Sequence, residues 1–181
     1  GMAGGAAKET TMVRILLAED NDLIATTLQQ QLTSLGYEVV GVAHGGDELI
    51  RLSEQFQPDL VLLDMQLPAL TRDMLGAHFG AKSLIPAVVM TDFADADVVR
   101  QAEAAGIDAY LVKPVNPDEL PPAIDIALAR HRDIQHLRAQ VDTLQGTIEA
   151  RQLLGRANGI LLKRVDFSDA SAEERLQAGA R

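Results

Sequence analysis

Four short apolar runs in this chain each end in a different polar side chain, and this feature constrains the fold more than any other. The runs span residues 13–18, 60–63, 87–90 and 109–112, and they are followed by Glu19 with Asp20, by Asp64, by Thr91 and by Lys113. Apolar runs without alternation are typical of parallel strands that are buried on both faces. Because parallel sheets bind ligands beyond the carboxyl ends of their strands, these side chains are expected to share one site.

Helix patterns separate these runs. Helices are expected over residues 22–35, with Asn21-Asp22 as the helix start, over 47–56, over about 95–105 and, more weakly, within 70–84. Residues 37–43 are expected to form a further strand. A last helix is expected to begin at Asn116-Pro117, where an N-cap residue is followed by proline at the first helical position. Five strand–helix units of this length predict an α/β fold, a doubly wound parallel sheet with helices on both faces.

The composition excludes several kinds of chemistry. The 181 residues are 47% hydrophobic and contain no cysteine, which excludes disulfides, thiolate nucleophiles and zinc–thiolate sites and fits a cytoplasmic protein. No apolar run reaches the roughly 20 residues that span a bilayer, so no membrane partner is expected. The glycine before Met2 is interpreted as a tag remnant, and residues 1–11 as a disordered leader.

The net charge of −10 is unevenly distributed. Residues 12–130 hold 18 acidic and 7 basic residues, which gives −11, whereas residues 131–181 hold 7 acidic and 8 basic residues, which gives +1. Only the C-terminal part is therefore suited to approach a polyanion. A solvated helix face explains the same charges without any partner, and this alternative stays open.

The last helix pattern is too long for an ordinary domain helix, because it continues without turn residues to about Arg164. Apolar residues at alternating steps of three and four form an a/d pattern of about three heptads, which consists of Ile134, Leu137, Val141, Leu144 and Ile148. This pattern predicts a coiled-coil helix over residues 131–150 that forms a homodimer, and Arg130 interrupts the pattern at its start. The alternative is a helix that packs back on its own domain.

The acidic residues at the predicted sheet edge need a counter-charge. Two unit charges about 4 Å apart repel by roughly 4 kcal/mol at an effective dielectric near 20, so Glu19, Asp20 and Asp64 together favour a bound cation or a raised pKa. An all-oxygen site with few protein ligands suits Mg²⁺, which shares its coordination shell with waters and phosphate oxygens. A carboxylate beside that metal can attack a phosphoryl group, while Lys113 and Thr91 stabilise the developing charge.

These residues, with the segments 58–68 and 110–114, resemble the receiver domain of two-component response regulators. The resemblance covers residues 12–130. It implies a five-stranded sheet of strand order 2-1-3-4-5, a sensor histidine kinase as partner and Asp64 as the phosphorylated residue.

The resemblance also implies a role for each residue around Asp64. Asp20 would bind Mg²⁺ directly, Glu19 mainly through water, and Gln66 through its backbone carbonyl. Thr91 and Tyr110 would form a switch pair, in which the hydroxyl moves toward the phosphoryl group and the ring turns inward. The peptide bond before Pro114 would be cis.

Two positions depart from the family pattern. Asp92 replaces the small residue that usually follows Thr91, and its negative charge at the mouth of the site is expected to slow attack on anionic phosphodonors. Residues 69–73 replace the usual glycine-rich turn, so a reshaped loop is expected there. A phosphotransferase of the haloacid dehalogenase type is an alternative, but it needs a second acid where this chain has Gln66. A doubly wound domain whose acids have no function is the other alternative.

A second resemblance covers residues 149–181. The segment Arg156-Ala157-Asn158-Gly159-Ile160 is similar to the signature of the ANTAR family of RNA-binding antitermination regulators. Residues 151–181 are therefore expected to form a small helical output unit. This unit is divergent or incomplete, because Asn158, Glu173 and Gln177 replace a lysine, an aromatic residue and an arginine, which are the groups that contact phosphates and bases.

Together these features predict a response regulator that accepts a phosphoryl group on its own Asp64 and turns over no external substrate. Phosphorylation would control RNA binding and transcription antitermination through the output unit. The alternative is a phosphorylation-dependent interaction or scaffold protein whose output does not bind RNA.

Overall fold

A computed structural model describes the backbone of residues 11–80, 82–92 and 96–179, and within these ranges it describes side chains up to residue 157. Residues up to Ile134 form one compact unit and residues from Gln135 form a second. The first unit contains a five-stranded parallel sheet of order β2-β1-β3-β4-β5, which confirms the predicted fold class. The strands are β1 (Arg14–Ala18), β2 (Glu38–Ala43), β3 (Leu60–Asp64), β4 (Ala87–Thr91) and β5 (Ala109–Val112).

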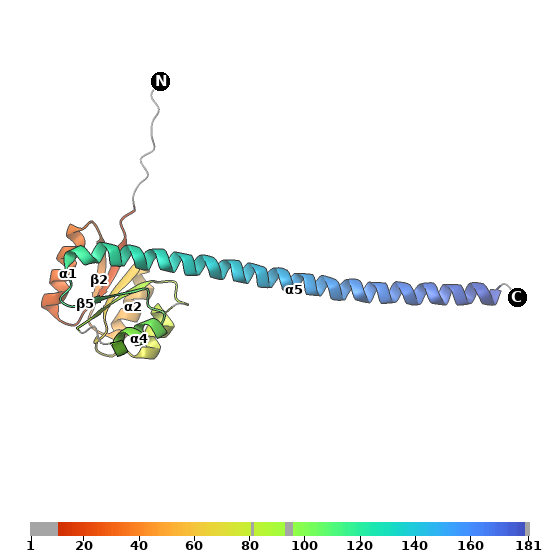
Figure 1. The fold of residues 1–181 in the computed structure, drawn as a ribbon, viewed down its shortest axis with the longest axis horizontal. Coiled ribbons are helices and arrows are strands. Elements are labelled where there is room, and N and C mark those ends of the chain that lie inside the picture. The colour runs from red at the N-terminus through yellow and green to blue at the C-terminus, as the bar shows by residue number, and fades with distance from the viewer. Residues whose placement is uncertain (1–10, 81, 93–95, 180–181) are drawn as a thin grey trace, which may run out of the picture. The chain divides into compact units, whose positions relative to one another are not determined.

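Helices cover both faces of this sheet (Figure 1). One face packs against α1 (Asp22–Ser34) and the first turns of α5 (Leu120–Gly179), and the other packs against α2 (Gly46–Phe56), α3 (Arg72–Phe79) and α4 (Ala96–Ala104). Alternate residues of each central strand enter the two cores: Leu60 and Leu62 of β3 enter the first, and Val61 and Leu63 enter the second. Every residue of β3 is buried, which explains its apolar run without alternation.

The helix starts agree with the predicted caps. The Asn21 side chain accepts hydrogen bonds at 3.1 Å from the backbone N–H groups of Leu23 and Ile24, at the start of α1. Asn116 does the same for Asp118 at 3.0 Å, at the start of the 3₁₀ turn η1 (Pro117–Glu119) that precedes α5. The peptide bond before Pro114 is cis, as predicted.

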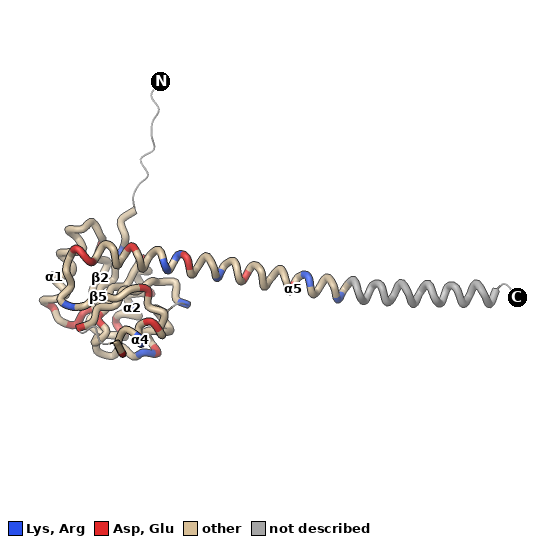
Figure 2. The backbone as a smooth tube through the Cα atoms, viewed as in Figure 1, with Lys and Arg blue, Asp and Glu red and all other residues tan. Residues whose placement is uncertain are grey.

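Helix α5 continues from the first unit into the second. In the second unit the large apolar side chains of the predicted heptads are exposed. They are Leu137 (59%), Val141 (51%), Leu144 (62%) and Ile148 (53%). Basic and acidic residues both occur along this part of α5 (Figure 2). The helix runs through residues 150–151, where the sequence predicted the start of an output unit, and the predicted domain borders stay predictions. Among the described helices, none is both long and apolar enough to cross a membrane.

Some predictions fall outside the described part of the chain. The leader predicted over residues 1–11 lies there almost entirely, since the description begins at residue 11. Of the predicted output residues, Arg156 and Ala157 are described and exposed, whereas the side chains of Gly159 and Ile160 are not described. Nothing in the structure therefore tests the output signature.

The loop after β3 lies against the start of α2. The Gly46 N–H donates to the carbonyl of Pro68 at 2.7 Å, and a Cβ atom at Gly46 would lie 2.2 Å from the Ala69 carbonyl oxygen. Only glycine allows this close approach. Ala69 itself has a φ of 59°, in the left-handed region that L-residues avoid. The loop thus keeps a conformation that favours glycine, although the sequence places alanine there.

Replacing Ala69 with glycine should stabilise the first unit. The left-handed conformation costs an L-residue roughly 1–2 kcal/mol, and the greater freedom of glycine in the unfolded chain cancels part of that gain. We expect Ala69→Gly to raise the free energy of unfolding by about 0.5–1 kcal/mol in urea denaturation.

The matched control is Ala77→Gly, in the exposed middle of α3. There the same change should lower the free energy of unfolding by about 0.5–1 kcal/mol, because the backbone is helical. If both variants are destabilised equally, Ala69 does not carry the strain.

Candidate functional site

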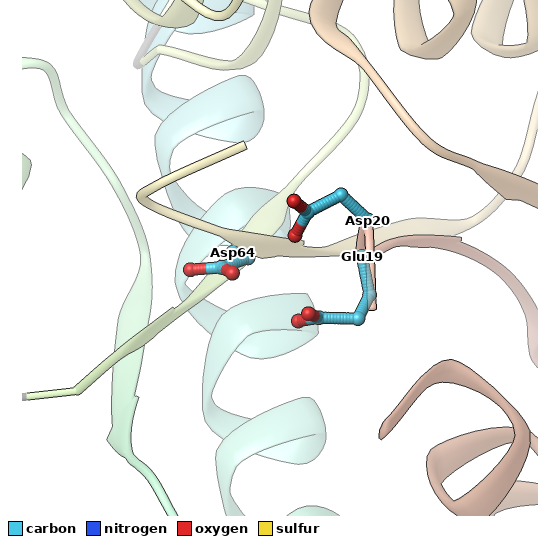
Figure 3. Close-up of side chains that lie close together, drawn as sticks. All are labelled: Glu19, Asp20 and Asp64. Carbon is cyan, nitrogen blue, oxygen red and sulfur yellow. The ribbon is translucent and has the colours of Figure 1, made fainter. Parts of the chain in front are cut away.

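Three carboxylates meet at the carboxyl edge of the sheet. Glu19 and Asp20 follow β1, and Asp64 is the last residue of β3, the strand that pairs with β1. One carboxylate oxygen from each lies within 4.8 Å of the others, and Figure 3 shows the side chains of Glu19 and Asp20 extending toward Asp64. Glu19 and Asp64 are buried, whereas Asp20 is exposed. The convergence predicted from the ends of the apolar runs is therefore present.

Lys113 connects this cluster to the far edge of the sheet. It follows β5, and its ammonium Nζ lies 2.8 Å from Glu19 Oε2 and 2.9 Å from Asp64 Oδ2. Its own N–H donates to the Thr91 carbonyl at 2.7 Å, which fixes the strand end that carries the side chain. One lysine thus holds residues from strands β1 and β3 that lie 94 and 49 positions away in the sequence.

Burial and charge shift the pKa values within this cluster. Burial raises the pKa of Glu19, the hydrogen bond from Lys113 lowers it, and the Asp64 charge raises it again, so that the pKa lies above its ordinary value. Burial alone would lower the pKa of Lys113, but its hydrogen bonds to Glu19 and Asp64 outweigh that effect and raise the pKa. The lysine is therefore held in its charged form.

Thr91 and Tyr110 occupy two neighbouring strands beside the acids. Thr91 ends β4 and is 5% exposed, and it pairs in register with Val112. Tyr110 lies on β5 opposite Val89, and its side chain is 47% exposed. The strands thus place Thr91 at the edge that carries Lys113, and Tyr110 farther back along β5. Their role as a switch pair stays a prediction.

Backbone groups complete the surroundings of the acids. The Gln66 N–H donates to Asp64 Oδ1 at 3.0 Å, whereas the predicted metal contact of the Gln66 carbonyl stays a prediction. The Asn21 N–H donates to Glu19 Oε1 at 3.3 Å. Sequence reasoning identified Asn21 only as a helix cap. The position of Asn21 directly after Glu19 and Asp20 could have indicated that the backbone of this turn also donates to the Glu19 carboxylate.

The residues present fit a divalent metal ion. Three carboxylates and the single ammonium of Lys113 leave a net charge of −2 in the cluster. Burial is the main cause of the raised pKa of Glu19 and the charge of Asp64 adds to it, so a nearby cation would favour the ionised carboxylate. The Asp20 carboxylate has no hydrogen-bond partner within the described part of the chain, so it is available as a ligand. Ligands that are all oxygen suit Mg²⁺ better than softer metals.

This fold and this edge of acids with a lysine define a class of protein. The family of response regulator receiver domains matches residues 15–125, which is more than half of the chain. The chain therefore belongs to the response regulator receiver domain family of two-component systems.

Relatives extend this similarity beyond the receiver. The transcriptional regulatory protein PdtaR of Mycobacterium tuberculosis is 38% identical over 167 residues, which cover 92% of this chain and 82% of that protein. Because the receiver match spans 111 residues (125 − 15 + 1), an alignment of 167 residues must include part of helix α5 beyond it. The response regulator GacA of Pseudomonas viridiflava is 32% identical over 135 residues, 71% of this chain and 61% of that protein.

A solved structure supports the fold independently. A CheY-like receiver domain protein of Methanospirillum hungatei JF-1 is 28% identical, with a TM-score of 0.60 over 68% of this chain and 98% of that one. The relatives are thus transcriptional or response regulators by name, and the shared structure is the receiver.

The metal can be tested by removing single charges. We expect Asp20→Asn to weaken Mg²⁺ binding more than Glu19→Gln, because Asp20 is exposed and free of hydrogen bonds in the described structure while Glu19 is bound to Lys113. Isothermal titration calorimetry with MgCl₂ measures both affinities.

The control is Asp22→Asn, which removes an acid two positions beyond the cluster whose side chain is 93% exposed. This variant should bind Mg²⁺ as the unchanged chain does. Equal affinity in all variants would show that the acids do not form a metal site.

Proposed function

We propose that this protein is a response regulator whose Asp64 accepts a phosphoryl group from a sensor histidine kinase and thereby controls an output in the C-terminal segment. The observation that carries the proposal is the contact of Lys113 with the buried Asp64 at 2.9 Å, inside a cluster of three acids. An aspartate on the protein surface without a chemical role would not need a lysine held against it by a second acid. We further propose that the chain modifies only itself and acts in the cytoplasm.

The transfer step follows from the contacts of Asp64. In this step the donor is a phosphorylated histidine of the kinase. A carboxylate oxygen of Asp64 forms a bond to phosphorus, the bond between phosphorus and the histidine nitrogen breaks, and the leaving imidazole takes up a proton. Bound Mg²⁺ would supply positive charge to the phosphate oxygens. The Lys113 ammonium, now held by Glu19 and Asp64, lies where it can pair with a phosphate oxygen, and the Thr91 hydroxyl is the proposed donor to another.

The output proposal rests on the C-terminal segment. We propose that residues 151–181 form an ANTAR-like unit that binds RNA and relieves transcription termination. Its first support is the Arg156-Ala157 part of the signature, which is exposed. Its second support is the similarity to PdtaR, which continues beyond the C-terminal end of the receiver match. The near-neutral charge of residues 131–181, compared with −11 for the receiver, also favours this segment for contact with a polyanion.

The second candidate is a scaffold whose phosphorylated form binds proteins and not RNA. This candidate is favoured because Asn158 and Glu173 replace a lysine and an aromatic residue of the signature, which are groups that contact RNA. The exposed Leu153 and Leu154, 64% and 63% exposed, provide apolar surface that suits a protein contact.

The phosphoacceptor can be identified by labelling. Incubation with acetyl phosphate and Mg²⁺ should add one base-labile phosphoryl group, and Asp64→Asn should remove it, because the amide cannot form an acyl phosphate. Intact-mass measurement detects the addition. The control Asp47→Asn, an exposed acid at the start of α2, should be labelled normally. Labelling of Asp64→Asn would overturn the assignment.

The proposed homodimer rests on the exposed heptads of α5. Burying each such side chain contributes roughly 1.5–3 kcal/mol, and together they can exceed the several kcal/mol that association costs. Replacing Leu137 and Leu144 with lysine should therefore give monomers in sedimentation, since like charges would meet across the seam.

The matched control adds the same two charges on the opposite side of the helix. Ala139→Lys with Ala150→Lys leaves the heptad residues intact, and this variant should stay dimeric. A dimeric Leu137→Lys, Leu144→Lys variant would show that the seam does not hold two chains together.

RNA binding separates the two proposed outputs. A hairpin RNA should shift in a gel with the phosphorylated chain, and the affinity should fall as salt rises, because phosphate contacts release counterions. Arg156→Gln should weaken the shift and Arg138→Gln, in the heptad segment, should not. Absence of any shift at low salt would favour the protein-binding alternative.

A further inference from the structure

Three residues connect the start of β5 to helix α5. Asp108 directly precedes β5 and is 4% exposed. Its carboxylate accepts a hydrogen bond from the N–H of Ala87, the first residue of β4, at 3.2 Å. Its carbonyl accepts one from the guanidinium of Arg130, on α5, at 3.0 Å. The next residue of α5, His131, is 8% exposed. Asp108, Arg130 and His131 are called the helix joint below.

Electrostatics also ties the helix joint together. Burial raises the pKa of Asp108, whereas the Ala87 N–H hydrogen bond and the charges of His131 and Arg130 lower it, with burial the largest effect. Both basic groups thus interact with one buried acid. From α4, Glu103 lines the same cavity of about 240 Å³ as Asp108 and Arg130. The joint therefore connects β4, β5 and α5 around a buried acid, and the Arg130 side chain reaches it from an exposed position.

The helix joint lies where α5 leaves the receiver. Arg130 and His131 come a few positions before Ile134, the last residue of the first unit. The buried residues of α5 are Leu120, Ala123, Ile124, Ala127 and His131, so His131 is the last of them among the residues whose side chains are described.

The helix joint is also close in sequence to the phosphoacceptor machinery. Asp108 lies two positions before Tyr110 of β5, and that strand is followed by Lys113, whose ammonium contacts Asp64. The carboxylate of Asp108 holds the start of β4, the strand that ends in Thr91. Asp108 thus contacts β4 through its carboxylate and Arg130 of α5 through its carbonyl.

We propose that the helix joint transmits the state of Asp64 to the dimer-forming segment of α5, through the hydrogen bond between Arg130 and the Asp108 carbonyl. This inference rests on the proposed function, because it assumes that phosphorylation of Asp64 alters the output. In this arrangement Arg130 is a positioning residue and has no part in the phosphoryl transfer. It explains why an arginine stands where the heptad pattern would place an apolar residue.

The test compares amide hydrogen exchange before and after treatment with acetyl phosphate and Mg²⁺, in the full chain. In the unchanged protein, phosphorylation should change exchange in residues 127–134. Arg130→Met, which keeps the apolar stem and removes the guanidinium, should lose this change while Asp64 is still labelled. Arg132→Met is the control, since Arg132 is exposed and two positions away on the same helix, and it should keep the change.

A conservative variant separates signalling from simple destabilisation. Arg130→Lys keeps a donor for the Asp108 carbonyl and should restore the phosphorylation-dependent change. Failure of this rescue, or a full change in Arg130→Met, overturns the inference. The inference is also overturned if amide exchange in residues 127–134 stays the same in a wild-type chain whose Asp64 is labelled. That result would leave the assignment of Asp64 as the phosphoacceptor intact. Absence of Asp64 labelling refutes the proposed function and, with it, the inference.

Discussion

The ammonium of Lys113 between Glu19 and Asp64 is the interaction on which the site depends. It lies 2.8 and 2.9 Å from the two carboxylates, which come from neighbouring strands and are almost fully buried. Breaking a buried charge pair by removing one partner leaves an uncompensated charge, and this is more costly than the pair is favourable. The sheet order that places β1 beside β3 is what allows one side chain from β5 to reach both acids.

The sequence predicts the parts of this site that follow from strand burial. A strand buried on both faces must be apolar throughout, so its first polar residue marks the carboxyl edge, and Asp64 and Thr91 are both last residues of such strands. The contacts made by loops could not be predicted. The approach of Gly46 to the Ala69 carbonyl depends on a left-handed residue within the loop, and the Asn21 contact with Glu19 depends on the shape of a turn.

In helix α5, too, some features were predictable from the sequence and others were not. Its heptads were predicted from the sequence, and the exposure of Leu137 and Leu144 in one chain is what an unpaired seam requires. The sequence gives no reason for Arg130 to interrupt that pattern, because its partner is the carbonyl of Asp108, 22 positions earlier. A residue that breaks a helical repeat can therefore mark the point where the helix still packs on its own domain and has not yet reached its next partner.

Modification of Asp64 cannot leave its surroundings unchanged. Oδ2 contacts the Lys113 ammonium and Oδ1 accepts the Gln66 N–H at 3.0 Å, so both oxygens already have partners. An acyl phosphate uses one oxygen for the bond to phosphorus, and at least one of these contacts must then be remade with the phosphoryl group. If the Lys113 contact is remade, the ammonium must leave its present position between Glu19 and Asp64, while the backbone of Lys113 stays bonded to the Thr91 carbonyl at 2.7 Å. A covalent change at the end of β3 thus alters first the contacts of Lys113, the residue that follows β5.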